Sequence, residues 1–127
     1  MPSAAQIILN MEKSMAREFN AGKRDALLGH FHPRVVGFSS TRKERIAGRV
    51  AMRKTFDYYY QASPKLKFHI AQPQVHVFGE VAVATFYWTV ELGTGSPRHA
   101  IHGRGSHVFA RHDGQWLIVH EHFSRVH

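Results

Sequence analysis

Three histidines near the C-terminal end of the chain have the side chains best suited to chemistry. They are His107, His120 and His122, within the stretch Gly103–Ser124. Asp113–Gly114 inside this stretch predicts a two-residue hairpin turn, because both central residues of such a turn need positive φ. In that register His107 lies opposite His120, and His122 shares their face because side chains alternate along a strand.

Imidazoles gathered on one strand face support four interpretations. Part-protonated rings would bind a small anion through charge and hydrogen bonds. A ring that titrates near neutral pH would act as a general acid or base. Alternate histidines could also share a metal ion, but no carboxylate joins them on this face, and no metal site is predicted. The fourth interpretation is that the rings only fill a polar core.

The first half of the chain has apolar residues at helical spacing. Helices are expected over residues 3–22, 23–31 and 48–64. Ser3 with Gln6 forms a capping box at the start of the first helix, and Pro33 ends the second. A short strand is expected over residues 35–39, followed by a polar loop over 40–47.

From Leu66 onward the hydrophobic period changes to two. Strands are expected over residues 66–78, 81–92, 99–112 and 115–124, with a bulge or edge at Pro73 and a loop over 93–97. Helices followed by an antiparallel meander indicate an α+β fold. In this register an apolar patch covers the outer face of the sheet; it consists of Phe86, Trp88, Val90, Val108, Ala110, Leu117 and Val119. A patch of that size predicts a homodimer or a higher ring.

Composition limits the class of protein. The chain has 127 residues, of which 43% are hydrophobic, and this is enough for one domain with a core. Cysteine is absent, no run is long enough to span a membrane, and no signal peptide begins the chain, so a cytoplasmic protein without membrane contact is expected. The net charge is +8. The basic residues between Arg42 and Lys54 lack interleaved aromatic residues, so nucleic-acid binding is not predicted.

The order of elements and several motifs resemble the nuclear transport factor 2-like superfamily, which includes ketosteroid isomerase and the SnoaL-like cyclases. The likeness is greatest to the association domain of calcium/calmodulin-dependent kinase II and its bacterial stand-alone relatives. Its matching stretches are residues 74–79, 81–91, 111–116 and 119–122. Tyr87, His120 and His122 match the pocket positions of that domain, whereas Met52, Thr89 and His107 replace its arginines and histidine.

The resemblance implies a single domain over residues 1–127. Its cone-shaped, curved antiparallel sheet and three N-terminal helical segments would enclose a pocket. The expected function is to bind a small, possibly anionic molecule or to assemble copies of the chain, without a cofactor. The alternative is an acid–base isomerase, dehydratase or cyclase in which His107 and His120 exchange protons. The assigned inner face has no carboxylate, and the nearest candidates are Asp25 and Glu91. The predicted ligand-binding residues are Phe56, Tyr87, Thr89, His107, His120 and His122.

The helix that carries Phe56 also carries three consecutive tyrosines, Tyr58, Tyr59 and Tyr60. They could close the mouth of the pocket and stack on a ligand. Helical spacing favours a plainer arrangement, in which Phe56, Tyr59 and Tyr60 pack on the sheet and Tyr58 faces solvent.

Overall fold

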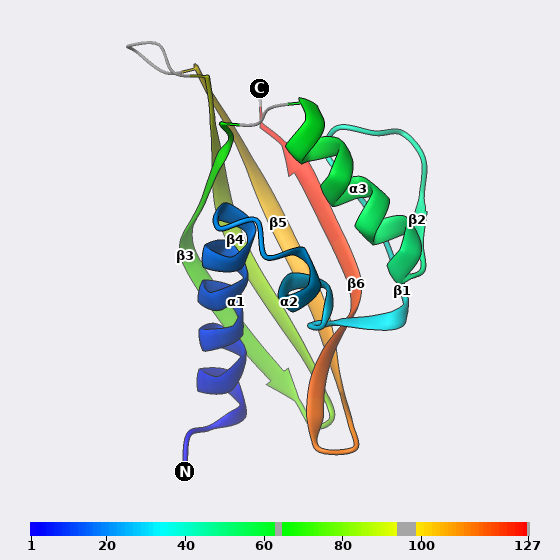
Figure 1. Cartoon of the computed structure of the whole chain (residues 1–127). Coiled ribbons are helices and arrows are strands. Elements are labelled where there is room, and N and C mark those ends of the chain that lie inside the picture. Colours follow the sequence, from blue (N-terminus) through cyan, green and yellow to red (C-terminus); the bar gives the residue numbers. More distant parts are fainter. Residues whose placement is uncertain (63–64, 94–98, 127) are drawn as a thin grey trace.

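A computed structural model of the chain describes residues 1–62, 65–93 and 99–126. Helices come first along the chain and a long meander of strands follows (Figure 1). The elements are α1 Ala4–Asn20, α2 Arg24–Leu28, β1 Phe31–Phe38, β2 Ile46–Ala47, α3 Arg49–Ala62, β3 Lys67–Phe78, β4 Val81–Leu92, β5 His99–His112 and β6 Gln115–Arg125.

Helix α1 begins at the predicted cap. The Ser3 hydroxyl accepts a hydrogen bond from the Gln6 amide at 3.1 Å, which satisfies one of the free N–H groups of the first turn. The buried residues of the helix are Ile8, Glu12, Met15 and Phe19, which recur at helical spacing. This stripe faces the sheet, and it includes a carboxylate where an apolar residue is usual.

The second predicted helix is shorter than expected. Helix α2 ends at Leu28, and Phe31 already begins strand β1, so the predictions of a helix to Phe31 and of a strand starting at residue 35 are wrong. Pro33 lies inside β1, where the pairing with β6 is irregular between Phe31 and Val36. A proline cannot donate to the ladder, so the irregularity accommodates it.

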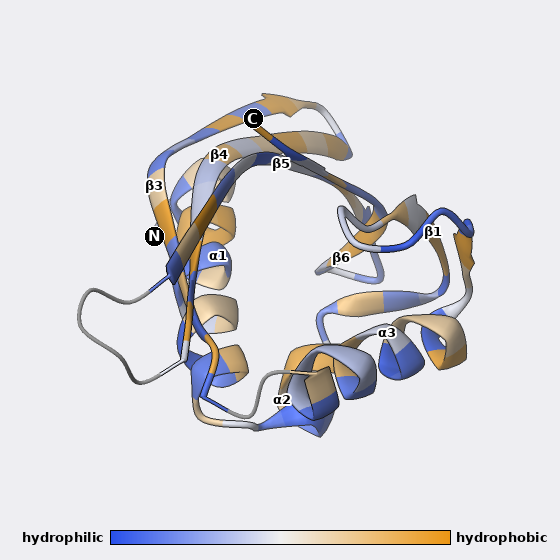
Figure 2. Ribbon diagram, turned by 90° about the horizontal axis from the view of Figure 1, so that it is seen from above, coloured by the Kyte–Doolittle hydropathy of each residue, from blue (hydrophilic) through white to orange (hydrophobic). Residues whose placement is uncertain are grey.

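The strands form one curved, open sheet in the order β2-β1-β6-β5-β4-β3. Neighbours are antiparallel except β1 and β6, which are parallel. Figure 2 shows α1 against the β3 side of the curve and α3 on the β1 side. The strands β4 and β5 have the predicted bounds. The register of β3 shifts between Ala71 and Gln74, which confirms the predicted bulge at Pro73.

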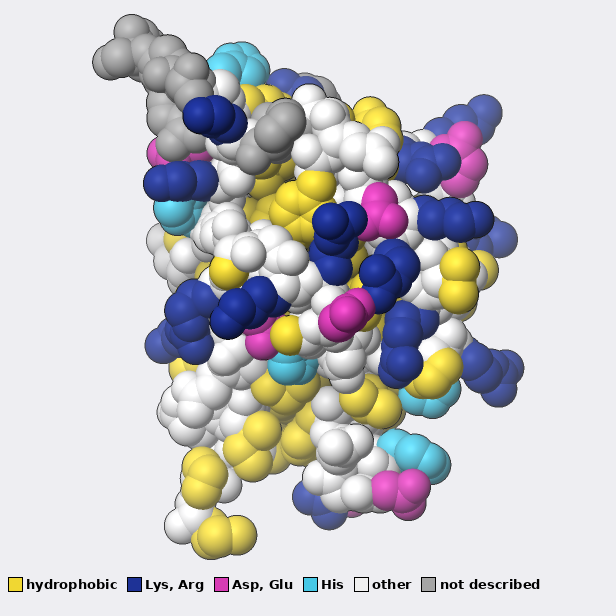
Figure 3. Space-filling model, viewed as in Figure 1, with side chains coloured by type: hydrophobic (Ala, Val, Ile, Leu, Met, Phe, Trp, Pro, Cys, Tyr) yellow, Lys and Arg dark blue, Asp and Glu magenta, His cyan; other side chains and the backbone are white. Residues whose placement is uncertain are grey.

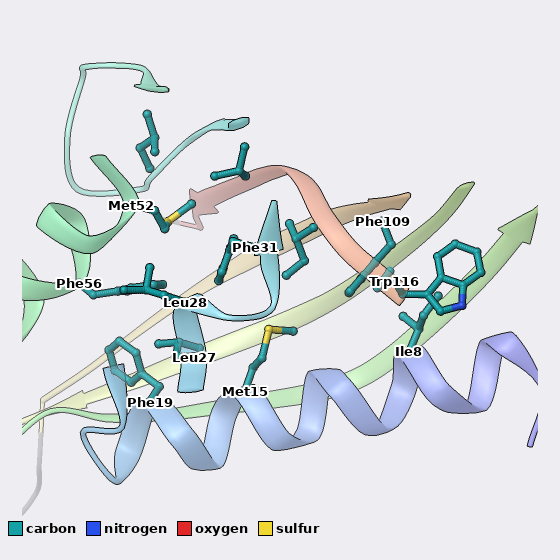
Figure 4. Packing of buried hydrophobic residues seen from close by; sticks show 14 of the residues in the cluster. Ile8, Met15, Phe19, Leu27, Leu28, Phe31, Met52, Phe56, Phe109 and Trp116 are labelled. Atoms are coloured by element: carbon teal, nitrogen blue, oxygen red, sulfur yellow. The ribbon is translucent and has the colours of Figure 1, made fainter. Parts of the chain in front are cut away.

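Apolar side chains from all the helices meet the inner face of the sheet. Met15 and Phe19 of α1, Leu27 of α2 and Phe56 of α3 converge on Phe31 of β1 (Figure 4). The far end of the core contains Ile8, Phe109 and Trp116. Since the sheet curves around these contacts, the helices fix the shape of the space left between them and the strands.

The predicted outer patch mixes the two faces of the sheet. Phe86 and Trp88 are only 4% exposed and point inward, because Phe86 pairs with Gly105 and Trp88 with Gly103 on the inner face of β5. Val108, Ala110 and Leu117 belong to the outer face, as expected. No helix of the described residues is both long and apolar enough to cross a membrane.

Candidate functional site

A cavity of about 290 Å³ lies between the helices and the inner face of the sheet. Its walls come from α1, α3 and the four long strands, and nearly all of them are apolar. Hydrophobic side chains are visible between α1 and α3 on the surface shown in Figure 3. The lining residues that the argument uses are Glu12, Ala16, Phe56, Tyr59, Phe86, Trp88, His107, Glu121 and Phe123.

Aromatic rings form the strand side of the cavity. Phe123 lies 5.9 Å from Trp88 and 5.6 Å from Phe86, measured between ring centroids. Phe86 and Trp88 can lie across β5 because Gly103 and Gly105 have no side chains. A Cβ atom on Gly105 would lie 2.5 Å from the Phe86 ring, and one on Gly103 would lie 2.1 Å from the Trp88 ring. The two glycines therefore serve to make room for the aromatic wall.

One charged cluster faces this apolar space. His107 Nδ1 is 2.7 Å from Glu12 Oε2, and His107 Nε2 is 2.7 Å from Glu121 Oε1. All three side chains are buried. Helix α1 supplies Glu12, while neighbouring strands β5 and β6 supply His107 and Glu121, which are register partners. We call Glu12, His107 and Glu121 the buried triad.

The two carboxylates determine the charge of the imidazole. Burial by itself lowers the pKa of His107, but the charges of Glu12 and Glu121 and the hydrogen bonds to them outweigh burial and raise that pKa to about 10. At neutral pH His107 is therefore an imidazolium that donates one hydrogen bond from each ring nitrogen. Neither nitrogen is left to contact a ligand. The other oxygen of each glutamate is the polar group that the triad can offer to the cavity.

A tyrosine lies beside the triad. Burial raises the pKa of the Tyr59 phenol, hydrogen bonds to Ser39 and Thr41 lower it, and the charge of Glu121 adds to the increase. Tyr59 stays protonated near neutral pH and is a second polar group of the cavity wall. Tyr60 instead packs on Phe19, with its hydroxyl 2.6 Å from the Phe19 carbonyl oxygen, and the side chain of Tyr58 is 45% exposed at the rim. The predicted exposure of Tyr58 is confirmed, whereas Tyr60 packs on helix α1 instead of the sheet and Tyr59 lines the cavity.

Two of the six predicted ligand-binding residues line the cavity. These are His107 and Phe56. The other four, Tyr87, Thr89, His120 and His122, belong to the opposite face of the sheet. Tyr87 is 54% exposed there, and Thr89 lies 3.1 Å from His102. Their predicted contact with a ligand in this cavity therefore has no support in the geometry.

The predicted pairing of His107 with His120 is wrong. The hairpin turn at Asp113–Gly114 is present, with φ of 50° and 77° at its two residues. However, Phe109 pairs with Ile118 and Val108 with His120, so Val119 is the extra residue of a β-bulge. The bulge shifts the register by one, turns His120 and His122 outward, and places Glu121 beside His107. A metal site shared by the three histidines is lost with that register.

Glu12 and Glu121 are functional candidates that the sequence prediction missed. The sequence offered no clear carboxylate for the inner face, and its nearest candidates lie elsewhere: Asp25 pairs with Arg53 at the surface and Glu91 with His69 on the outer face. Glu12 did carry a signal, since it follows Ile8 by four residues in the buried stripe of α1. Among the described residues, no group of three or more histidine, aspartate or glutamate side chains is arranged so that it could hold a metal ion.

The basic residues between Arg42 and Lys54 are largely bound within the chain. Arg53 pairs with Asp25, Arg42 lies 3.6 Å from Glu44, and the Arg49 guanidinium donates to the Phe31 carbonyl oxygen at 2.6 Å. Figure 3 shows Lys and Arg side chains mixed with acidic ones around α3. This pattern is that of a solvated charged surface, and the absence of nucleic-acid binding stays a prediction.

The comparisons with known proteins agree with this architecture. A family model described as the SnoaL-like domain matches residues 8–127. No curated protein matches the sequence significantly. Solved structures share the fold at low sequence identity, so they carry no information on the ligand of this chain.

Three solved structures illustrate the range of proteins with this fold. An NTF2-like protein of unknown function from Pseudomonas putida is 20% identical, with a TM-score of 0.86, over 95% of this chain and 85% of the other. The hub of calcium/calmodulin-dependent kinase II from S. rosetta is 21% identical, with a TM-score of 0.84, over 99% of both chains. A proposed dehydratase from Streptomyces avermitilis is 15% identical, with a TM-score of 0.81, over 94% and 93%.

Proposed function

Because the chain belongs to the SnoaL-like family, we propose that its cavity binds a small, neutral and largely apolar organic molecule. The observation that carries the proposal is the apolar lining of the 290 Å³ cavity, whose charged groups among the described residues are those of the buried triad. Ligand pockets usually combine an apolar wall with a few polar groups that fix orientation. Here the aromatic wall would hold the body of the ligand.

The buried triad favours a neutral ligand over the anion expected from the histidines. Two carboxylates flank a single imidazolium, so the cluster carries a net negative charge when both glutamates are ionised. An anion entering this space would be repelled and would lose its hydration. A hydroxyl or amine hydrogen on the ligand, in contrast, would find a carboxylate oxygen as acceptor.

A matched pair of probes tests this preference. We expect 2-naphthol, which is neutral at pH 7, to bind at least about tenfold more tightly than 2-naphthoate in isothermal titration calorimetry, a difference of roughly 1.4 kcal/mol. Ala16→Phe, which fills the cavity, should abolish binding of the naphthol. Ala26→Phe on the exposed side of α2 is the control and should leave binding unchanged. The proposal would be contradicted if both probes bound equally well, or if the naphthol bound neither to the unmodified protein nor to any variant.

A second candidate function is acid–base catalysis, in which the glutamates replace the predicted histidines. The observation in its favour is a pair of buried carboxylates, each with one oxygen that does not bond His107. Glu12 or Glu121 would take a proton from a carbon next to a substrate carbonyl. His107 would act as a positioning residue whose positive charge holds both carboxylates in place.

Proton exchange reports such catalysis without knowledge of the natural substrate. The enzyme would speed deuterium uptake by 2-tetralone in heavy water, followed by proton NMR. Glu121→Gln should lower the rate by about a hundredfold, which is at the lower end of what a general base contributes. Glu18→Gln is the control, because Glu18 lies on the same helix as Glu12 but pairs with His30 outside the cavity. Exchange no faster than in buffer would leave binding as the function.

We also propose that copies of the chain associate through the outer face of the sheet. The kinase hub domain of similar fold is by its name an assembly domain, and it supports this proposal. The support from the chain itself is a set of apolar side chains exposed on that face, among them Val36, Phe78 and Val81. The mass of the complex in solution distinguishes a dimer from a ring.

A further inference from the structure

The outer face of the sheet carries polar side chains in two adjoining rows. Strand register defines both rows, because residues that pair across neighbouring strands stand side by side. The first row is Gln74, Thr85, Ser106 and His122, and the second is Tyr87, Arg104 and Ser124, with the apolar Ala71 as the partner of Tyr87 on β3. The rows cross β3, β4, β5 and β6 on the side opposite the buried triad.

A groove of about 370 Å³ follows these rows. Its lining offers a guanidinium, an imidazole, hydroxyl groups and side-chain amides, and no carboxylate of a described residue borders it. Ser106 lies at its centre, flanked by Thr85 and His122 in one row and next along β5 to Arg104. Hydrogen-bond donors and a positive charge with no carboxylate beside them are complementary to an anion.

The charge of Arg104 is available in this groove. Three other arginines are held in ion pairs: Arg24 pairs with Asp57, Arg53 with Asp25, and Arg111 with Glu80 at 3.0 Å. No ion pair joins Arg104 to any described residue, and its side chain is exposed. A guanidinium can hold two oxygens of one carboxylate or phosphate at once, so it is the natural anchor for an oxyanion.

We propose that the groove formed by the two rows binds a compact oxyanion, either a carboxylate or a phosphate group. Arg104 supplies the charge, and the hydroxyls of Ser106 and Tyr87 supply hydrogen bonds beside it. The site is distinct from the cavity, since the sheet separates the two. The histidine pattern predicted an anion ligand, and this groove would bind that anion outside the cavity. The groove includes Tyr87 and His122, which were among the predicted ligand-binding residues.

An NMR titration of the ¹⁵N-labelled protein tests the site. Sodium malonate and inorganic phosphate would be added separately at pH 7, with chloride adjusted to hold ionic strength constant. We expect saturable shifts of amide peaks grouped in residues 85–87, 104–106 and 122–124. Arg104→Gln should weaken binding by about tenfold, as expected for the loss of a hydrogen bond to a charged group. The tighter of the two probes identifies the oxyanion class.

Arg111→Gln is the matched control on the same strand. Its guanidinium is held by Glu80 and lies over Trp116, so the substitution removes the same charge from the protein without touching the groove. Binding should be unchanged in this variant. Shifts that do not saturate, that spread over the basic residues of α3, or that weaken equally in both variants would overturn the proposal.

Discussion

His107 makes folding stability depend on pH because its two ring nitrogens face carboxylates. Its pKa is about 10 in the folded chain, against about 6.5 for histidine in an unfolded chain. Stability from a pKa raised on folding is complete below the unfolded value and is lost as pH rises through the folded value. The free energy of unfolding should therefore fall by up to about 1.4 kcal/mol per pH unit between about pH 6.5 and pH 10. Urea denaturation across this range measures the slope.

The variant His107→Leu should lose this dependence between about pH 6.5 and about pH 10 and show a different one at lower pH. Without the imidazolium, Glu12 and Glu121 become two like charges in an apolar cavity, which costs about 3 kcal/mol or more at neutral pH. These carboxylates would take up protons as the pH falls, so this variant should gain stability toward pH 5. His30→Leu, at the part-exposed pair with Glu18, should cost less than about 1 kcal/mol. A wild-type slope no steeper than that of His107→Leu would show that the triad is not charged as described.

The strands show how far local patterns predict the fold. The bounds of β4 and β5 and the turn at Asp113–Gly114 follow from alternation and turn chemistry, which are local properties. The bulge at Val119 is not local, because it depends on how β6 fits between β5 and β1. Phe123 carried a weak signal, since only the bulged register places this aromatic side chain inside. Because the bulge was not predicted, Glu121 was assigned to the outer face and was not recognised as a partner of His107.

The sequence did not show which side chains of β4 point inward, for a different reason. Both of its faces carry residues that suit a buried position, and the opposing inner positions of β5 are Gly103 and Gly105, which have no side chains to reveal a face. Only the assembled sheet shows that the large rings of Phe86 and Trp88 occupy the space above these glycines. The cavity was therefore predicted as a consequence of the fold class, while most of its lining was not.

Substitution of the two glycines tests their role in the aromatic wall. In Gly103→Ala the new Cβ would lie 2.2 Å from the Ser124 carbonyl oxygen as well as against Trp88, so backbone must move. We expect a loss of about 2 kcal/mol in the free energy of unfolding, which is typical of overpacking. In Gly105→Ala the nearest atoms belong to the Phe86 ring alone.

The difference between the two glycines predicts a specific rescue. Phe86→Leu should remove much of the cost of Gly105→Ala, since the shorter side chain frees the space, and a double-mutant cycle measured by denaturation quantifies the coupling. The same substitution should not rescue Gly103→Ala, whose clash with Ser124 remains. Additive effects in the Gly105 cycle would mean that the glycine serves sheet curvature rather than ring packing.

At the scale of the whole molecule, the two faces of the sheet present different surfaces. The inner face forms the cavity. On the outer face, Val81 pairs with Ala110 and Ala110 with Leu117, while Val83 pairs with Val108 in the next row. These five residues form an outer apolar patch toward the hairpin ends, next to the polar groove. Phe78 and Val81 are 67% and 41% exposed at its edge, which is unusual for large apolar side chains on a lone chain.

Self-association through the outer apolar patch is the last prediction. Light scattering at tens of micromolar protein should give a mass of at least two chains, and Leu117→Lys should return it to one, because a charge buried at an interface is costly. Trp88→Lys is unsuitable for this test, since Trp88 lies in the cavity and its loss would disturb folding. Ile7→Lys on the exposed side of α1 is the control and should leave the mass unchanged. A wild-type protein that scatters as one chain would refute assembly through this face, and the binding of naphthol and oxyanion, which needs no second copy, could still be measured on that monomer.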